Sequence, residues 1–218
     1  VRDAASIARA TRHRAQRRTA GPSHRGGMTR LAARTTLVAL ALLLAALAWA
    51  QSPPWGDAAY DAEVAIHAGD ALEMVVRTEV GPQGVRYTAR DADGEVLMEA
   101  LLVWSDGAVR GWLHDGEGFE PADELVGSVV SAVVDPTAPG HGVCSMPDVR
   151  CDVEGEEEVA GRATRRMAIE QPGLGPATVW VDLATGLAIA SEGGGDPPVR
   201  SELVRLDEGA PDPGRLAP

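Results

Sequence analysis

Between residues 72 and 80, apolar side chains occupy every second position of the chain except at Thr78. Met74 and Val76 belong to this series, and charged residues such as Glu73 and Arg77 lie between its members. A period of two residues places the apolar side chains on one face of a β-strand. Similar segments follow after turns rich in glycine and aspartate, and we expect strands at residues 72–80, 85–90, 96–104 and 108–114. The connections are short enough for hairpins, so the pattern predicts an antiparallel meander with one packed and one solvated face.

The period changes to three and four residues between positions 122 and 134. This spacing predicts an amphipathic helix, with Asp123 and Glu124 in its first turn and Pro136 beyond its end. A helix with one apolar stripe requires a surface to cover, and the packed face of the meander provides one. Beyond the helix, turn signals again separate short segments, and we expect strands at residues 152–160, 162–170, 177–182, 187–192 and 199–206. Together these patterns predict an α+β fold that is mainly β.

An uncharged apolar run extends from residue 37 to residue 48, and two arginines precede it. The small-x-small cleavage motif Ala48-Trp49-Ala50 follows the run. We therefore predict a signal peptide at residues 28–50, cut before Gln51, and export of the mature chain to the periplasm or the cell exterior. The run is shorter than the roughly 20 residues that span a bilayer, so no stable membrane span is expected after cleavage. An uncleaved anchor is the alternative.

The other parts of the chain differ in composition. Residues 1–27 are rich in arginine and are expected to be untranslated or disordered; a basic arm that binds nucleic acid is the alternative. Residues 51–70 are expected to form an extended leader, because Pro53 and Pro54 cannot enter the interior of a helix. We expect a single β-rich domain at residues 71–208 and an extended, proline-rich tail at residues 209–218.

The charge of the chain is unevenly distributed. The 218 residues include 20 basic residues, all of them arginine, and 32 acidic residues, which gives a formal net charge of −12. Nine arginines and one aspartate lie in the first 50 positions, so residues 51–218 contain 11 arginines and 31 acids, a net charge of −20. A domain this acidic repels phosphate backbones, so we do not expect it to bind nucleic acid.

The two cysteines, Cys144 and Cys151, have six residues between them. In an exported protein this arrangement favours a disulfide. His141 could extend the pair to three zinc ligands, but no second histidine lies nearby, and the Cys-x-x-Cys spacing of redox sites is absent. We therefore expect a disulfide and no metal site.

Residues 154–158 contain four glutamates, and this run is expected at a solvated sheet edge, where charge discourages aggregation. A calcium site is the alternative. The mature chain has three histidines, His67, His114 and His141, and no hydrolase, metalloprotease, nucleotide-binding or dinucleotide-binding motif. We therefore expect no enzymatic activity and no cofactor, although a hydrolase with an unmarked triad remains an alternative.

The second half of the chain carries a series of strand and turn motifs that resembles a known family. The motifs are Val153-Glu154-Gly155-Glu156-Glu157-Glu158-Val159-Ala160-Gly161-Arg162, Met167-Ala168-Ile169, Val179-Trp180-Val181-Asp182 and Thr185-Gly186-Leu187. In this order they resemble the periplasmic lipoprotein-carrier superfamily, that is, LolA- and LolB-like carriers and the N-terminal domain of RseB/MucB-type regulators. The resemblance covers residues 150–206 and implies a curved antiparallel sheet, an unclosed half-barrel, around helices with an apolar cavity between them. From the sequence given we expect no counterpart of the second domain of RseB-type regulators, and the mature region predicts only one helix.

Members of that superfamily bind the acyl chains of lipoproteins or sense mislocalised lipoproteins. The resemblance therefore implies an exported, non-catalytic protein that binds a lipid or an acylated lipoprotein in a cavity between sheet and helix. The residues expected to line the cavity are Met74, Val76, Met98, Leu102 and Trp104 from the sheet and Leu125, Val129 and Val133 from the helix. Ordinary core packing is the other interpretation of these residues. The alternative function is an envelope protein-protein interaction module with a fully packed core.

Overall fold

The computed structural model describes residues 52–173 and 175–217. The expected signal peptide at residues 28–50 and the segment 1–27 lie outside these residues. None of the described helices is both long and apolar enough to cross a membrane.

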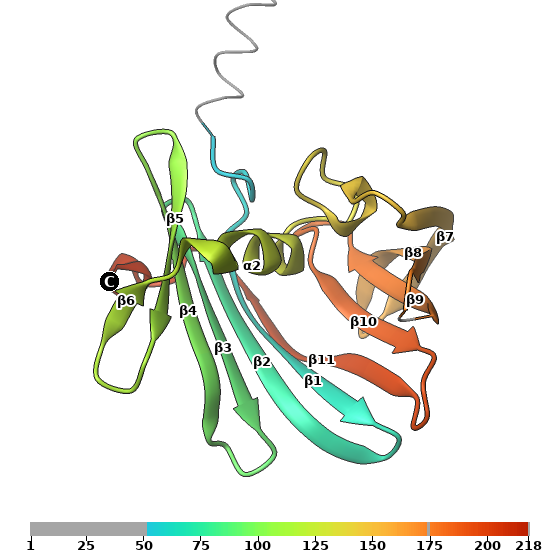
Figure 1. The fold of residues 1–218 in the computed structure, drawn as a ribbon. Helices are drawn as coiled ribbons and strands as arrows, with labels where there is room; N and C mark the ends of the chain where they lie inside the picture. Colours follow the sequence, from blue (N-terminus) through green and yellow to red (C-terminus); the bar gives the residue numbers. More distant parts are fainter. Residues whose placement is uncertain (1–51, 174, 218) are drawn as a thin grey trace, which may run out of the picture. The chain divides into compact units, whose positions relative to one another are not determined.

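Strands and short helices alternate in a simple order along the chain (Figure 1). The strands are β1 (Tyr60–Ala68), β2 (Ala71–Gly81), β3 (Gly84–Asp91), β4 (Val96–Ser105), β5 (Ala108–His114), β6 (Phe119–Pro121), β7 (Arg150–Val159), β8 (Arg162–Gln171), β9 (Gly175–Asp182), β10 (Ala188–Gly193) and β11 (Val199–Glu208). The helices are the 3-10 turn η1 (Asp123–Leu125), the α-helix α2 (Val126–Val133) and the 3-10 turns η2 (Val143–Ser145) and η3 (Pro213–Leu216). All nine expected strands and the expected helix are therefore confirmed, with ends that shift by a few residues.

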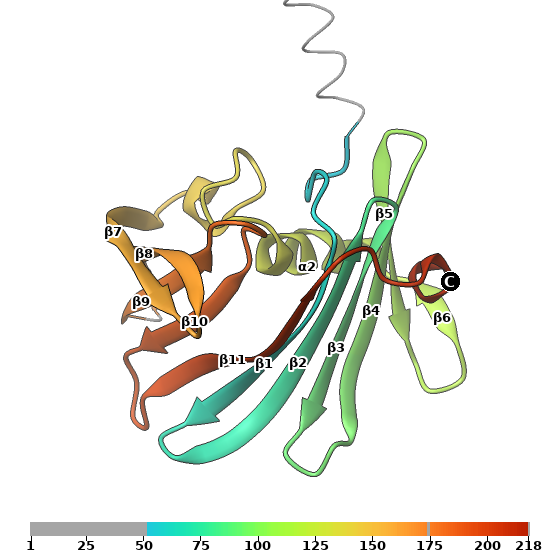
Figure 2. The same ribbon diagram turned by 180° about the vertical axis from the view of Figure 1, so that it is seen from behind.

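Within the described residues, all eleven strands form one antiparallel sheet in the order β6-β5-β4-β3-β2-β1-β11-β10-β9-β8-β7. The first strand, β1, thus lies at the centre of the sheet, and the following strands continue outward to the edge strand β6. The chain then passes through α2 to the other edge strand, β7. From there the strands return toward the centre, where β11 pairs with β1. Figures 1 and 2 show the sheet curving around α2. The two edge strands β6 and β7 do not pair, so the expected curved, unclosed half-barrel is confirmed.

The hairpin turns explain why neighbouring strands are antiparallel. Asp106 and Gly107, between β4 and β5, both have positive φ values, of 53° and 76°. Ala160 and Gly161, between β7 and β8, have φ values of 52° and 74°. Two successive residues with positive φ match the right-handed twist of the flanking strands, which is why such turns close two-residue hairpins.

The expected leader was only partly correct, because its second half forms the central strand β1. Tyr60 and Trp55 are both buried, and the Trp55 Nε1 group donates a hydrogen bond to the Gly81 carbonyl. The apolar face of β1 includes the small residue Ala62, and Ala65 breaks the polar alternation, so its period is weak in the sequence. The pairing of this segment with β2 on one side and with β11 on the other therefore determines that it forms a strand.

The core lies between α2 and the centre of the sheet. Its buried members are Trp55, Tyr60, Ala62, Val80, Val85, Ala100, Leu102, Val129, Val130, Val133, Val134, Leu187 and Ile189. The Tyr60 hydroxyl donates a hydrogen bond of 3.1 Å to the Val133 carbonyl at the end of α2. This contact joins the central strand to the helix and shows which face of β1 lies against α2.

The opposite face of the sheet is covered in part by the C-terminal segment, which the sequence predicted to be an extended tail. This segment instead forms η3, and its Leu216 is 5% exposed. Arg215 lies 3.0 Å from the Glu79 carboxylate, and Arg77 contacts the same carboxylate at 3.4 Å. Glu79 is almost fully buried, so these two guanidinium groups compensate its charge.

Replacing Leu216 by alanine should lower the free energy of unfolding by about 2 kcal/mol, because the change removes a buried side chain that packs above Gly81 and Gly84. Urea denaturation measures the loss, and limited proteolysis should show earlier cleavage after Arg215. Val204→Ala is the matched control, because Val204 is 58% exposed. An unchanged unfolding midpoint for Leu216→Ala would show that the C-terminal segment is not held to the sheet.

Candidate functional site

One face of the central strands carries apolar side chains beyond the area that α2 covers. Tyr60 marks the helix-facing side of β1, and alternation along the strand places Val64 and Ile66 on the same side. The register extends this side across the sheet: Val64 lies opposite Val76, Ile66 opposite Met74, Val76 opposite Ala89 and Ala89 opposite Met98. We call these six residues the open apolar face.

None of the six residues of the open apolar face belongs to the core cluster that includes the valines of α2. Val76 and Ala89 are 8% and 6% exposed, whereas Val64, Ile66, Met74 and Met98 are only half-buried. A helix of eight residues is about 12 Å long and about 10 Å wide, whereas β2, with eleven residues, is about 36 Å long. Because α2 crosses the strands (Figure 1), it covers only part of their length.

The eight residues that the sequence predicted to line a cavity fall into two groups. Leu102, Val129 and Val133 are buried members of the core, and Trp104 and Leu125 are partly buried and pack against it. Met74, Val76 and Met98 lie on the open apolar face. The valines of α2 therefore fill the space between the helix and the sheet at the first group. Only the second group lies beside a part of the sheet that α2 does not cover.

A pocket of about 370 Å³ lies along the flank of α2. Its lining includes Pro54, Val109, Val126, Val130, Met146 and Pro147. The sequence pattern did not indicate a site at these residues, because they come from the leader, β5, α2 and the loop before β7. No periodicity in the sequence links segments that are so far apart. The only feature that could have indicated this pocket is Met146, an apolar residue next to a proline in a loop.

The expected disulfide is confirmed. Cys144 and Cys151 are bonded, with Cα atoms 5.7 Å apart, and the bond holds the loop that contributes Met146 to this pocket. Because both sulfurs are bonded to each other, the zinc alternative with His141 is excluded. On the chain-entropy model, closing so short a loop contributes about 2.5 kcal/mol to stability.

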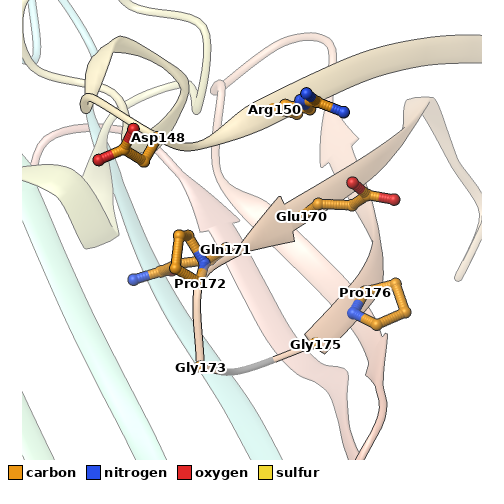
Figure 3. A pocket seen from close by; sticks show the side chains of 8 residues that line it. All are labelled: Asp148, Arg150, Glu170, Gln171, Pro172, Gly173, Gly175 and Pro176. Atoms are coloured by element: carbon orange, nitrogen blue, oxygen red, sulfur yellow. The ribbon is translucent and has the colours of Figure 1, made fainter.

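A second pocket lies at the turn between β8 and β9 (Figure 3). Arg150 and Glu170, on the paired strands β7 and β8, are opposite in register, and the side chains of Asp148 and Gln171 extend away from them. These polar groups do not converge on one point, which a catalytic or metal site would require. In residues 52–173 and 175–217, no group of His, Cys, Asp and Glu side chains is arranged to hold a metal ion.

A largely buried ion pair lies between Asp182, at the end of β9, and Arg162. The Asp182 carboxylate also accepts hydrogen bonds from the backbone and the hydroxyl of Thr185, each 2.8 Å long. Burial raises the pKa of Tyr60, and the negative charge of Asp182 raises it further. Tyr60 therefore remains protonated and serves as the hydrogen-bond donor to Val133.

The acidic run lies on β7, which is an edge strand as the sequence predicted. Its Glu154 and Glu157 lie 3.0 Å and 3.9 Å from the Nε atom of Arg166 on β8. The run is exposed to solvent throughout. Charged residues at such an edge discourage pairing with another chain.

Comparisons with known proteins concern the fold alone. No model of a protein family matches the sequence, and no curated protein matches it. Among solved structures, MucB is similar with a TM-score of 0.47 and 18% identity over 78% of this chain and 60% of MucB. A LolA-superfamily protein from Nitrosomonas europaea has a TM-score of 0.34 and 9% identity over 74% of this chain and 91% of its own. The lipoprotein LppX from Mycobacterium tuberculosis has a TM-score of 0.35 and 13% identity over 71% of this chain and 89% of its own.

The likeness is one of fold. The curved, unclosed antiparallel sheet that the motifs between residues 153 and 187 implied is present in this structure itself, and the chain spans 60% of the length of MucB. The binding properties of this chain have to be inferred from its own residues.

Proposed function

We propose that the mature chain is an exported, non-catalytic carrier or sensor that binds the apolar groups of a lipid or an acylated lipoprotein on the open apolar face. The observation that supports this proposal is the position of Met74, Met98 and their neighbours on the helix-facing side of the sheet but outside its packed core. Antiparallel sheets usually have one face packed and the other solvated and polar. An uncovered apolar area on the packed side is typical of a binding surface.

The chemistry of this surface suits an acyl chain. All six side chains are uncharged, and the two methionines are flexible enough to adapt to a chain of variable conformation. Each methylene group that leaves water contributes roughly 0.8 kcal/mol before the cost of ordering the ligand. The disulfide Cys144–Cys151 is compatible with an oxidising compartment, as the proposed export requires.

The Met98→Asp variant should bind a fluorescent fatty-acid probe at least about tenfold more weakly than the parent protein, because a carboxylate on the open apolar face would have to lose water when the probe binds. The measurement is a titration of probe fluorescence. Leu97→Asp is the matched control: Leu97 is the adjacent residue and is 57% exposed, so the same charge is introduced without a change to the face. Equal affinity of both variants would contradict the assignment of this face.

The interaction module with a packed core remains the second candidate, because Leu102, Val129 and Val133 are tightly packed. For that function, the parent protein should take up no fatty-acid probe but should retain an envelope protein in a pull-down. Binding through the acidic surface would weaken as salt is added.

A further inference from the structure

A pocket of about 270 Å³ lies on the second half of the sheet, where β7, β9, β10 and β11 contribute to its lining. Its lining includes one aromatic ring, three carboxylates and one guanidinium group, which belong to Trp180, Glu157, Glu192, Glu202 and Arg200. We call this site the Trp180 pocket. An aromatic ring beside an excess of carboxylates is suited to bind a cation.

The Trp180 pocket lies on the outer face of the sheet, which is the face turned away from α2. Ala65 of β1 alternates with the residues of the open apolar face, so its side chain points to the outer face. Glu202 is opposite Ala65 in the register, and Ala190 is opposite Glu202. Trp180 in turn is opposite Ala190. Residues opposite one another share a face, so the sheet itself separates a ligand in this pocket from the open apolar face.

The small side chain of Ala190 leaves a gap between Trp180 and Glu202. Adjacent strands are about 4.8 Å apart, so the backbones of these two residues are about 10 Å apart, with only a methyl group between their side chains. Glu192, at the next outward-facing position of β10, lines the same pocket. A cation above Ala190 would therefore lie between the indole ring and two carboxylates.

One cation already contacts the indole ring from outside the pocket. The guanidinium carbon of Arg166, on β8, lies 5.9 Å from the centroid of the Trp180 ring. Arg166 is not among the residues that line the pocket, and it is opposite Trp180 on the side away from Ala190. The indole Nε1 group donates a hydrogen bond to the carboxylate of Glu157, which holds the ring in place. The part of the ring that lines the pocket is therefore left for a second cation.

The charges of the Trp180 pocket do not neutralise one another. Glu192 is exposed and forms no ion pair with a described residue, and Arg200 is opposite it in the register without a salt bridge to any described carboxylate. Glu202 is 56% exposed, and its Oε1 atom lies 3.2 Å from Nε2 of His67 without the alignment of a hydrogen bond. Two carboxylates are therefore accessible to a cationic group placed against the ring.

We propose that the Trp180 pocket binds an arginine side chain of a partner protein, an inference that is independent of the lipid-binding function proposed above. The guanidinium stacks on the indole ring and pairs with Glu192 and Glu202. Arginine fits better than lysine, because its charged group is planar and more weakly hydrated.

The surroundings of the pocket favour a protein as the source of this cation. Glu192, Arg200 and Glu202 are all exposed, so a protein surface can approach the pocket from solvent. Residues 51–218 have a net charge of −20, which attracts basic partners and speeds their association.

Titration of the mature chain with short peptides, followed by nuclear magnetic resonance, tests the proposal. The mature chain has four tryptophans, and Trp180→Phe identifies the indole signal of Trp180 by its loss. The probes are Gly-Arg-Gly and Gly-citrulline-Gly with blocked ends, because citrulline has nearly the shape of arginine without its charge. The arginine peptide should shift the Trp180 signal and bind at least about fivefold more tightly than the citrulline peptide.

Two charge variants should change the affinity for the arginine peptide in opposite directions. Glu192→Gln removes an attractive charge and should weaken binding about threefold, whereas Arg200→Gln removes a repulsive charge and should strengthen binding by a similar factor. Both residues are exposed, so neither change should disturb the fold. Glu156→Gln is the matched control, because Glu156 is exposed on β7 and alternates with the pocket residue Glu157.

The outcomes separate this proposal from the lipid-binding function. If the citrulline peptide binds as tightly as the arginine peptide, or if both charge variants behave like Glu156→Gln, the pocket does not recognise a cation and the proposal is overturned. If choline binds as tightly as the arginine peptide, the pocket belongs to a free small cation, and its link to a protein partner is overturned. Trp180→Phe should leave the affinity for the fatty-acid probe unchanged, because that probe binds on the other face of the sheet.

Discussion

Replacing Tyr60 by alanine should lower the free energy of unfolding by about 3–5 kcal/mol, the usual cost of deleting a fully buried aromatic side chain. Tyr60 is 0% exposed and lies on β1, the strand that pairs with both β2 and β11 and thereby joins the two meanders. Its hydroxyl also donates to the Val133 carbonyl, so the loss affects the contact between sheet and helix. Chemical denaturation followed by circular dichroism measures the change.

Tyr60→Phe is the matched control, because it removes the hydroxyl and keeps the ring. It should lower the free energy of unfolding by only about 1 kcal/mol, the net value of one hydrogen bond. If the alanine variant were as stable as the phenylalanine variant, the core would not depend on the ring, and the central position of β1 in this fold would be contradicted.

Replacing Asp182 by alanine should lower the free energy of unfolding by about 3 kcal/mol at neutral pH. The Asp182 side chain is 2% exposed, and its removal leaves the largely buried Arg162 with only the exposed Glu208 as a partner. Removing one member of a buried ion pair is costly, because the other charge remains without its compensation. The turn between β9 and β10 also loses the acceptor of the Thr185 backbone and hydroxyl groups.

Asp207→Ala provides the control for Asp182→Ala. The Asp207 side chain is 64% exposed and pairs with Arg205, which is itself 41% exposed. Surface ion pairs contribute little to stability, so this variant should change the free energy of unfolding by less than about 0.5 kcal/mol. If the two substitutions lowered the free energy of unfolding equally, the burial of Asp182 would not add to the cost of its removal.

The same carboxylate determines part of the pH dependence of stability. Burial alone would raise the pKa of Asp182, but hydrogen bonds from Arg162 and Thr185 outweigh it and lower the pKa below its usual value. For Asp61, burial is likewise outweighed by Arg77 and Arg205, and the pKa is again lowered. Each group therefore stabilises the folded state above its unfolded pKa of about 3.9, and this contribution is lost as the pH falls through the folded value. Thermal unfolding between neutral and acidic pH should show a smaller decrease for Asp182→Ala than for the parent.

Much of the fold could be predicted because its signals are local. The alternation in β2 to β5, the wider period of α2 and the glycine turns each depend on residues close together in the chain. The connections are short, so these local elements also determine the antiparallel order of each meander. The strand β1 was missed because the small residues Ala62 and Ala65 weaken its period. The C-terminal η3 was missed because a proline-rich segment has the composition of a free tail, and only the structure shows that its Leu216 is buried.

The sequence by itself thus determined the strands, the helix, the disulfide between Cys144 and Cys151, and an apolar strip that includes Met74, Val76 and Met98. Only the tertiary structure decided that β1 pairs with β11 and which apolar residues are packed or left open. It also brought Trp180, Glu192 and Arg200 into one pocket. The physical reason is that the period of the sequence shows which face of an element is apolar. The partner of that face depends on contacts between residues far apart in the chain, and these contacts form only when the sheet curves around α2.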